Sequence, residues 1–155
     1  MKILVINQSP ISYFKDILFE LGKKHEVTLF CGERDENLPN FIKYIFSEAY
    51  KRNSFLTRIK SWLIFSANLS CYLFFNSHKY KKILIVSNPP FAIWFTLICP
   101  RKTSILLFDI YPEILEQLDI KNKFYSILLN FVVFIWKFLN SLSYLFADKI
   151  FTISE

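Results

Sequence analysis

The chain alternates between short runs of aliphatic residues and longer stretches with helical periodicity. An apolar run of β-branched and aliphatic residues without alternation is typical of a strand buried on both faces, as in a parallel sheet. Such runs lie at 2–7, 26–30, 83–86, 104–108 and 149–153, with a less regular candidate at 41–46. We predict a strand at each of these positions.

The segments between the predicted strands have the spacing of amphipathic helices. The first, 12–24, places Phe14, Leu18 and Leu21 on one face and ends at Gly22 and two lysines. Further helices are expected at 54–77, 91–98, 113–119 and 123–147. Strands that alternate with helices predict an α/β domain with a doubly wound, mostly parallel, Rossmann-like sheet. The 155 residues fit a single domain, 1–155.

The two long helices, 54–77 and 123–147, are apolar over much more than half of their circumference, and each carries one narrow polar stripe. Three interpretations compete: burial between the sheet and other parts of the protein, contact with a membrane interface, and a span across the bilayer. Spanning needs about 20 apolar residues with few charges, whereas Lys137 interrupts the second helix after the run 124–136. We favour burial, followed by interfacial contact.

Composition narrows the function classes. Only Gly22 and Gly32 are glycines, which excludes a GxGxxG dinucleotide site and a P-loop. The net charge is +6, which suits a solvated surface, anionic lipid or a phosphate-bearing substrate. No basic helix or aromatic-basic RNA motif is present, so nucleic acid is not an expected partner. The 18 phenylalanines indicate either nucleotide bias or a surface that meets lipid.

The cysteines do not form a metal-binding pattern. Cys31, Cys71 and Cys99 are far apart, and neither His25 nor His78 completes a ligand set. We expect three reduced thiols in a cytosolic protein, with no metal. The four apolar residues after Lys2 are too few for a signal peptide.

Candidate functional residues lie in loops that directly follow predicted strands. Ligands of open parallel sheets bind beyond the carboxyl ends of the strands. Asp109 can serve there as a general base or orient a hydroxyl, although it can also cap the helix near Pro112. Glu113 can accept a ligand hydroxyl or only favour the helix dipole. Tyr111 can stack on a sugar ring or only pack the loop.

The remaining candidates are polar residues of two further loops. Ser87 and Asn88 can hydrogen-bond a ligand, or belong only to a rigid turn fixed by Pro89 and Pro90. Asn7 and Gln8 follow the first strand and can touch a donor or acceptor, although polar loop filler is the simpler interpretation. No Ser/His/Asp or Cys/His set is apparent.

Three motifs in order resemble the N-terminal domain of family-4 GT-B glycosyltransferases, which build bacterial capsule and lipopolysaccharide chains. They are Ser87-Asn88-Pro89-Pro90, Asp109-Ile110-Tyr111-Pro112-Glu113, and Ala147-Asp148-Lys149-Ile150 followed by Ser154-Glu155. The resemblance implies the acceptor-binding half of a two-domain enzyme. It further implies a nucleotide-sugar donor for the complete enzyme, a lipid-linked sugar acceptor, and a peripheral position at the cytoplasmic face of the inner membrane.

Two departures from the family pattern affect these expectations. The loop after the first strand, 8–12, lacks the glycine pair that lets backbone N–H groups approach the donor phosphates. The donor-binding domain is absent from the sequence, so we expect no sugar transfer and no bound cofactor unless a partner chain completes the site. The alternatives are a non-catalytic membrane-surface module that recruits a transferase subunit, an unrelated small α/β binding domain, and an inactive remnant.

Overall fold

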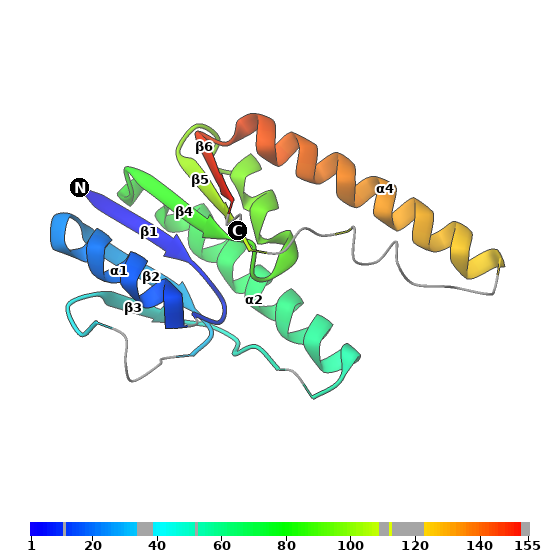
Figure 1. Cartoon of the computed structure of the whole chain (residues 1–155), viewed down its shortest axis with the longest axis horizontal. Helices are drawn as coiled ribbons and strands as arrows, with labels where there is room; N and C mark the ends of the chain where they lie inside the picture. The colour runs from blue at the N-terminus through cyan, green and yellow to red at the C-terminus, as the bar shows by residue number, and fades with distance from the viewer. Residues whose placement is uncertain (11, 34–38, 52, 109–111, 113–122, 153–155) are drawn as a thin grey trace.

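The fold is a parallel sheet with helices on both faces, seen here in a computed structural model (Figure 1). The structure describes residues 1–10, 12–33, 39–51, 53–108, 112 and 123–152, without the side chains at 12, 13, 55 and 123–126. In chain order the elements are β1 (Lys2–Ile6), α1 (Ser12–Lys24), β2 (Glu26–Cys31), β3 (Lys43–Phe46), α2 (Phe55–Asn76), the 3₁₀ helix η1 (Ser77–Lys79), β4 (Lys82–Val86), the 3₁₀ helix η2 (Pro90–Leu97), β5 (Thr103–Leu107), α4 (Lys123–Phe146) and β6 (Lys149–Thr152).

Within the described residues the sheet has six strands in the order β3-β2-β1-β4-β5-β6, and every neighbouring pair is parallel. The predicted doubly wound α/β class is therefore confirmed. The order reverses between β1 and β4, where Val5 pairs with Leu84 and Ile6 with Ile85. In open parallel sheets, a crevice forms at the carboxyl edge at such a switch point.

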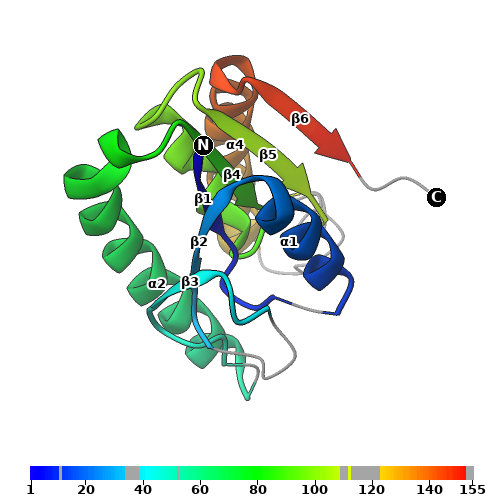
Figure 2. The same ribbon diagram turned by 90° about the vertical axis from the view of Figure 1, so that its left-hand side faces the viewer.

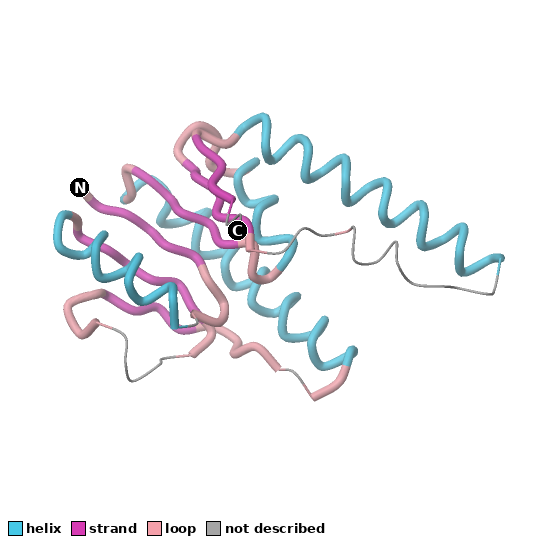
Figure 3. Tube along the Cα trace, viewed as in Figure 1, coloured by secondary structure: helices cyan, strands magenta, loops and turns pink. Residues whose placement is uncertain are grey.

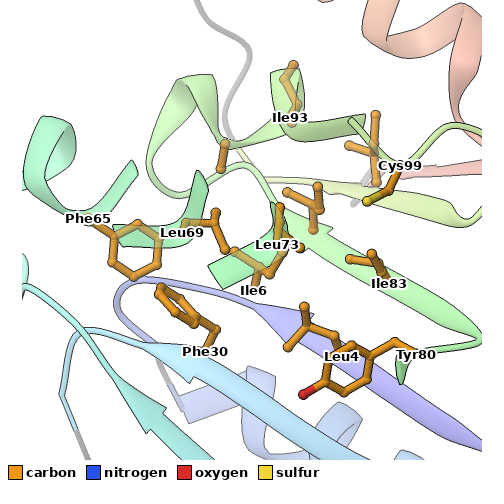
Figure 4. Packing of buried hydrophobic residues seen from close by; sticks show 13 residues of the cluster. Leu4, Ile6, Phe30, Phe65, Leu69, Leu73, Tyr80, Ile83, Ile93 and Cys99 are labelled. Atoms are coloured by element: carbon orange, nitrogen blue, oxygen red, sulfur yellow. The ribbon is translucent and has the colours of Figure 1, made fainter. Parts of the chain in front are cut away.

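Two hydrophobic clusters cover the two faces of the sheet. On one face, Phe14 and Leu18 of α1 pack on Ile3 and Val5 of β1. The opposite face carries the larger cluster, in which α2 and η2 pack on β1, β2 and β4. Figure 2 shows α1 and α2 on opposite sides of the sheet, and Figure 4 shows the larger cluster. Its labelled members are Leu4, Ile6, Phe30, Phe65, Leu69, Leu73, Tyr80, Ile83, Ile93 and Cys99.

Most predicted boundaries agree with the structure to within one or two residues, as the secondary structure in Figure 3 illustrates. The start of α2 has a local cause. Ser54 accepts a hydrogen bond from the Thr57 backbone N–H (3.2 Å), and Thr57 Oγ1 accepts one from the Ser54 backbone N–H (3.0 Å). This capping box satisfies two N–H groups that the first turn would otherwise leave without partners. The helix expected at 113–119 lies outside the described residues.

The expected burial of both long helices is wrong for their outer sides. On α2, Ser61 from the polar stripe is buried beside Phe65, whereas Leu56 and Phe74 are exposed. On α4, Asn140 is buried, and its Oδ1 accepts a hydrogen bond from Trp94 Nε1 of η2 (2.8 Å). Each helix therefore buries part of its polar stripe and leaves several large apolar side chains exposed on its outer side. The sequence has apolar residues on both sides, so its pattern did not identify the buried face.

Candidate functional site

The loops after β1 and β4 meet at the switch point. The backbone N–H of Gln8 donates to the carbonyl of Asn88 (3.0 Å), which ties the two loops together across the point where the strand order reverses. The Asn7 N–H donates to the Phe30 carbonyl (3.1 Å), and Asn7 Oδ1 accepts from the Ser9 N–H (3.2 Å). The structure thus brings Asn7 and Gln8 close to Asn88, which lies 80 residues after Gln8 in the sequence.

The Gln8 side chain points into the protein. It is fully buried, and its Nε2 donates to the carbonyls of Glu48 (3.0 Å) and Ser61 (3.2 Å). Its Oε1 is buried without a hydrogen-bond partner among the described residues. Gln8 therefore links the β1 loop to the segment before α2 and to α2 itself. Its role as a ligand contact stays a prediction, and the geometry gives its side chain a structural task.

Gly32 is a contributor to this region that the sequence did not single out. Its N–H donates to the Gln8 carbonyl (2.9 Å). A Cβ at this position would lie 2.5 Å from the Glu48 carbonyl oxygen, 2.8 Å from Ala49 Cα and 2.9 Å from the Gln8 carbonyl oxygen. Three backbone segments therefore converge where only a glycine fits. The scarcity of glycine, with one of the two directly after β2, is the sequence feature that could have identified this position.

The β4 loop holds Ser87 and Asn88 in different settings. Ser87 is buried, and its Oγ accepts a hydrogen bond from the Phe108 N–H at the end of β5 (2.9 Å). Asn88 is only half-buried, its N–H donates to the Val86 carbonyl (2.7 Å), and its peptide bond to Pro89 is cis. Ser87 therefore fixes the base of the β5 loop, while Asn88 is the more accessible of the two.

The three candidates with the strongest chemistry lie outside the described residues: Asp109, Tyr111 and Glu113. Their roles stay predictions. What the structure does describe is the residue before them, Phe108, whose N–H is held by Ser87 Oγ. The β5 loop therefore starts at the same edge of the sheet as the β1 and β4 loops.

The described part of the site is neutral. The side chains of Asn7, Gln8, Ser87 and Asn88 are amides and a hydroxyl, which can recognise hydroxyl groups by hydrogen bonding but do not transfer protons at neutral pH. Among the described residues no group of three or more His, Cys, Asp or Glu side chains is placed to hold a metal ion.

Cys31, directly before Gly32, is buried, and this burial raises its pKa to about 12.

A cavity of about 250 Å³ lies away from this site. Its walls include Met1, Lys82, Ser104 and Lys149, which stand at the amino-terminal ends of the strands. There Asp148 accepts a hydrogen bond from Lys82 Nζ (2.7 Å), and this bond lowers the pKa of the exposed carboxyl. The Asp148 N–H also donates to the Thr103 carbonyl (2.8 Å). This edge is opposite to the candidate site and organises the start of β4, β5 and β6.

The comparisons with known proteins support the fold. No family model matches the chain, and no curated protein matches its sequence. A solved structure does match: UGT2 of Phytolacca americana, a UDP-glycosyltransferase of GT-B fold, complexed with UDP-2fluoro-glucose and pterostilbene. The TM-score is 0.57 at 9% sequence identity, over 99% of this chain and 47% of that chain.

The chain thus shares the fold of part of this GT-B structure and spans about half of its length. At 9% identity the likeness concerns the fold and carries no residue roles.

Proposed function

We propose that this chain is the acceptor-binding half of a sugar-nucleotide-dependent glycosyltransferase of the family-4 type that builds bacterial surface polysaccharide. The observation that carries the proposal is the match of the entire chain to about half of a UDP-glycosyltransferase. The strand order supports it, because the reversal between β1 and β4 brings polar loops together at the edge where such sheets bind ligands.

Residue roles follow the chemistry of the loops. Asp109 would act as the base or orient the acceptor hydroxyl, with Glu113 and Tyr111 as further acceptor contacts. Asn88 would hydrogen-bond the same ligand, Ser87 would hold the β5 loop in position, and no metal is required.

The nucleotide-sugar would be held mainly by a donor-binding domain or partner chain. A lipid-linked sugar is the proposed acceptor, which places the protein peripherally at the cytoplasmic face of the inner membrane.

A transfer assay on the complex isolated from source cells tests the proposal. The chromosomal copy is tagged, cross-linked in membranes and purified with whatever donor-binding domain accompanies it. Transfer is measured from a panel of radiolabelled nucleotide-sugars to extracted lipid. We expect Asp109→Ala to abolish transfer at unchanged complex yield. Asp16→Ala removes an exposed carboxylate on α1 and should leave transfer intact.

The alternative is a non-catalytic module that recruits a transferase subunit. It is favoured by the β1 loop, which lacks glycine and whose Gln8 N–H is already bonded to Asn88. If the purified complex transfers sugar equally well with Asp109→Ala, the catalytic role fails and the recruiting role is supported. A complex that transfers no sugar from any donor overturns the enzyme assignment.

A further inference from the structure

Helix α4 has an outer face made only of apolar side chains. We define the α4 outer face as Ile127, Phe131, Phe134, Ile135, Phe138 and Leu145, all of which are exposed. At 3.6 residues per turn they fall within an arc of about 100°. Phe131 is 60% and Phe134 68% exposed. A continuous exposed apolar stripe of this size on a soluble domain marks an interaction surface.

The amino-terminal part of the outer face projects past the carboxyl edge of the sheet, because α4 is longer than the strands. Its 24 residues extend about 36 Å, whereas the five residues of β5 extend about 17 Å. The carboxyl end of α4 meets the sheet's amino-terminal edge, where the Arg101 N–H donates to the Phe146 carbonyl (2.9 Å). The surplus length therefore projects beyond the carboxyl edge of the strands, as Figure 1 shows.

The charges of α4 itself favour an anionic partner. The helix contains Lys123 and Lys137 and no Asp or Glu. The whole chain has a net charge of +6. Basic residues interspersed with exposed Phe, Leu and Ile are what a helix lying in an anionic lipid interface requires. A second copy of this chain would bring two positive surfaces together.

The inner side of α4 indicates that the helix lies on the bilayer and does not cross it. The stretch Ile127–Phe146 is long and apolar enough to span, with 17% of it buried. However, Val133, Asn140 and Ser143 are buried against the domain, and Asn140 is bonded to Trp94 of η2. A spanning orientation would pull these contacts apart, whereas an interfacial one uses only the outer face.

We infer that the α4 outer face docks into the interfacial layer of an anionic phospholipid bilayer and so holds the carboxyl edge of the sheet close to the membrane surface. The inference rests on the proposed function, since a lipid-linked acceptor would reach the loops after β1, β4 and β5 from the same bilayer. It adds which element makes the contact and which lipid chemistry it needs.

Co-sedimentation of the purified chain with vesicles of phosphatidylcholine, with and without phosphatidylglycerol, tests the inference. The double variant Phe131→Gln/Phe134→Gln should bind phosphatidylglycerol vesicles at least tenfold more weakly than the unmodified chain. The matched control is Phe46→Gln. Phe46 is 54% exposed and lies on β3, at the other end of the sheet from β6. This control should bind normally. All positions are exposed, and circular dichroism checks that each variant is folded.

Each other outcome overturns the inference. Equal binding by the double variant moves the contact elsewhere. Binding without phosphatidylglycerol removes the charge argument. A dimer in light scattering that the double variant abolishes, without vesicle binding, makes a second copy the occupant. Resistance of the cell-derived protein to carbonate extraction makes α4 a spanning helix. The vesicle assay contains no sugar donor and no partner chain, so its result is independent of the transfer assay. If the purified complex transfers sugar but the chain binds no vesicles, this inference is refuted and the proposed function stands.

Discussion

The replacement Gly32→Ala tests the packing that joins the β1 loop to the rest of the candidate site. The added Cβ would lie 2.5 to 2.9 Å from atoms of Glu48, Ala49 and Gln8, and all three are backbone atoms. No side-chain rotation can relieve these contacts, so the backbone itself must move. No glycine described here has a positive φ, so space and not backbone conformation is the constraint.

The expected cost combines two terms. Forcing an extra carbon into a tightly packed site costs about 1–3 kcal/mol. Weakening the hydrogen bond from the Gly32 N–H to the Gln8 carbonyl adds about 0.5–1.5 kcal/mol. We therefore expect the free energy of unfolding to fall by about 2–4 kcal/mol. For a domain of this length that corresponds to a decrease of about 5–15 °C in Tm.

The matched control is Gly22→Ala, which also creates a short contact. Here the new Cβ would lie 2.2 Å from Cε2 of Phe41. Phe41 is an exposed side chain that can rotate away, at the cost of its edge-to-face contact with Phe19. Alanine inside α1 gains about 1 kcal/mol of helix propensity over glycine. The two terms nearly cancel, so the free energy of unfolding should change by less than about 1 kcal/mol.

Urea denaturation followed by circular dichroism measures both variants, and chemical-shift changes in a ¹⁵N–¹H spectrum locate the disturbance. We expect Gly32→Ala to shift the amide resonances of the β1 and β4 loops. If Gly32→Ala is no less stable than Gly22→Ala, or if its shifts avoid these loops, the convergence of three backbone segments at this position is not what stabilises the site.

Three further predictions concern Cys31 and Asn140, both of which are buried. Native iodoacetamide labelling followed by peptide mass spectrometry should modify the exposed Cys71 and spare Cys31, whose pKa burial raises from 9.0 to about 12; comparable labelling of both would contradict this. In the unfolded chain the Cys31 thiol ionises at a lower pH than it does in the folded protein. The free energy of unfolding should therefore fall as pH rises from about 9 towards 12, and Cys31→Ala should flatten that dependence. Asn140→Leu leaves the Trp94 indole N–H without its acceptor and should cost about 1–3 kcal/mol in urea unfolding; an unchanged midpoint would show that this bond does not hold α4 in place.

The strands could be predicted from the sequence because each apolar run is short and bounded by polar or proline residues. Ile83–Val86, for example, is followed at once by Ser87. That Asn7, Gln8 and Asn88 lie at one edge of the sheet also follows from the pattern, since parallel strands share one carboxyl edge. That β1 and β4 are neighbours is known only from the structure. The inward direction of Gln8 could not be predicted, because its acceptors are carbonyls 40 and 53 residues away.

The orientation of the long helices was the main failure of sequence reasoning. Sequence periodicity identifies a core face only when the opposite face is polar. Helix α4 offers apolar side chains on both sides. The structure buries Asn140 and leaves Phe134 outside. The decisive information is the position of Trp94 on η2, a residue distant in sequence that supplies a hydrogen-bond partner.

Strand β6 has a consequence for how the domain opens. It lies at one end of the sheet, pairs with β5 alone among the described strands, and has all four residues exposed. Local opening free energies follow burial, so the amides of β6 should exchange with solvent long before those of β1 or β4. Strand β6 can therefore detach and re-anneal while the central strands stay folded. A polypeptide that adds a strand to this edge of the sheet would pair beside β6, the strand with the lowest expected opening free energy.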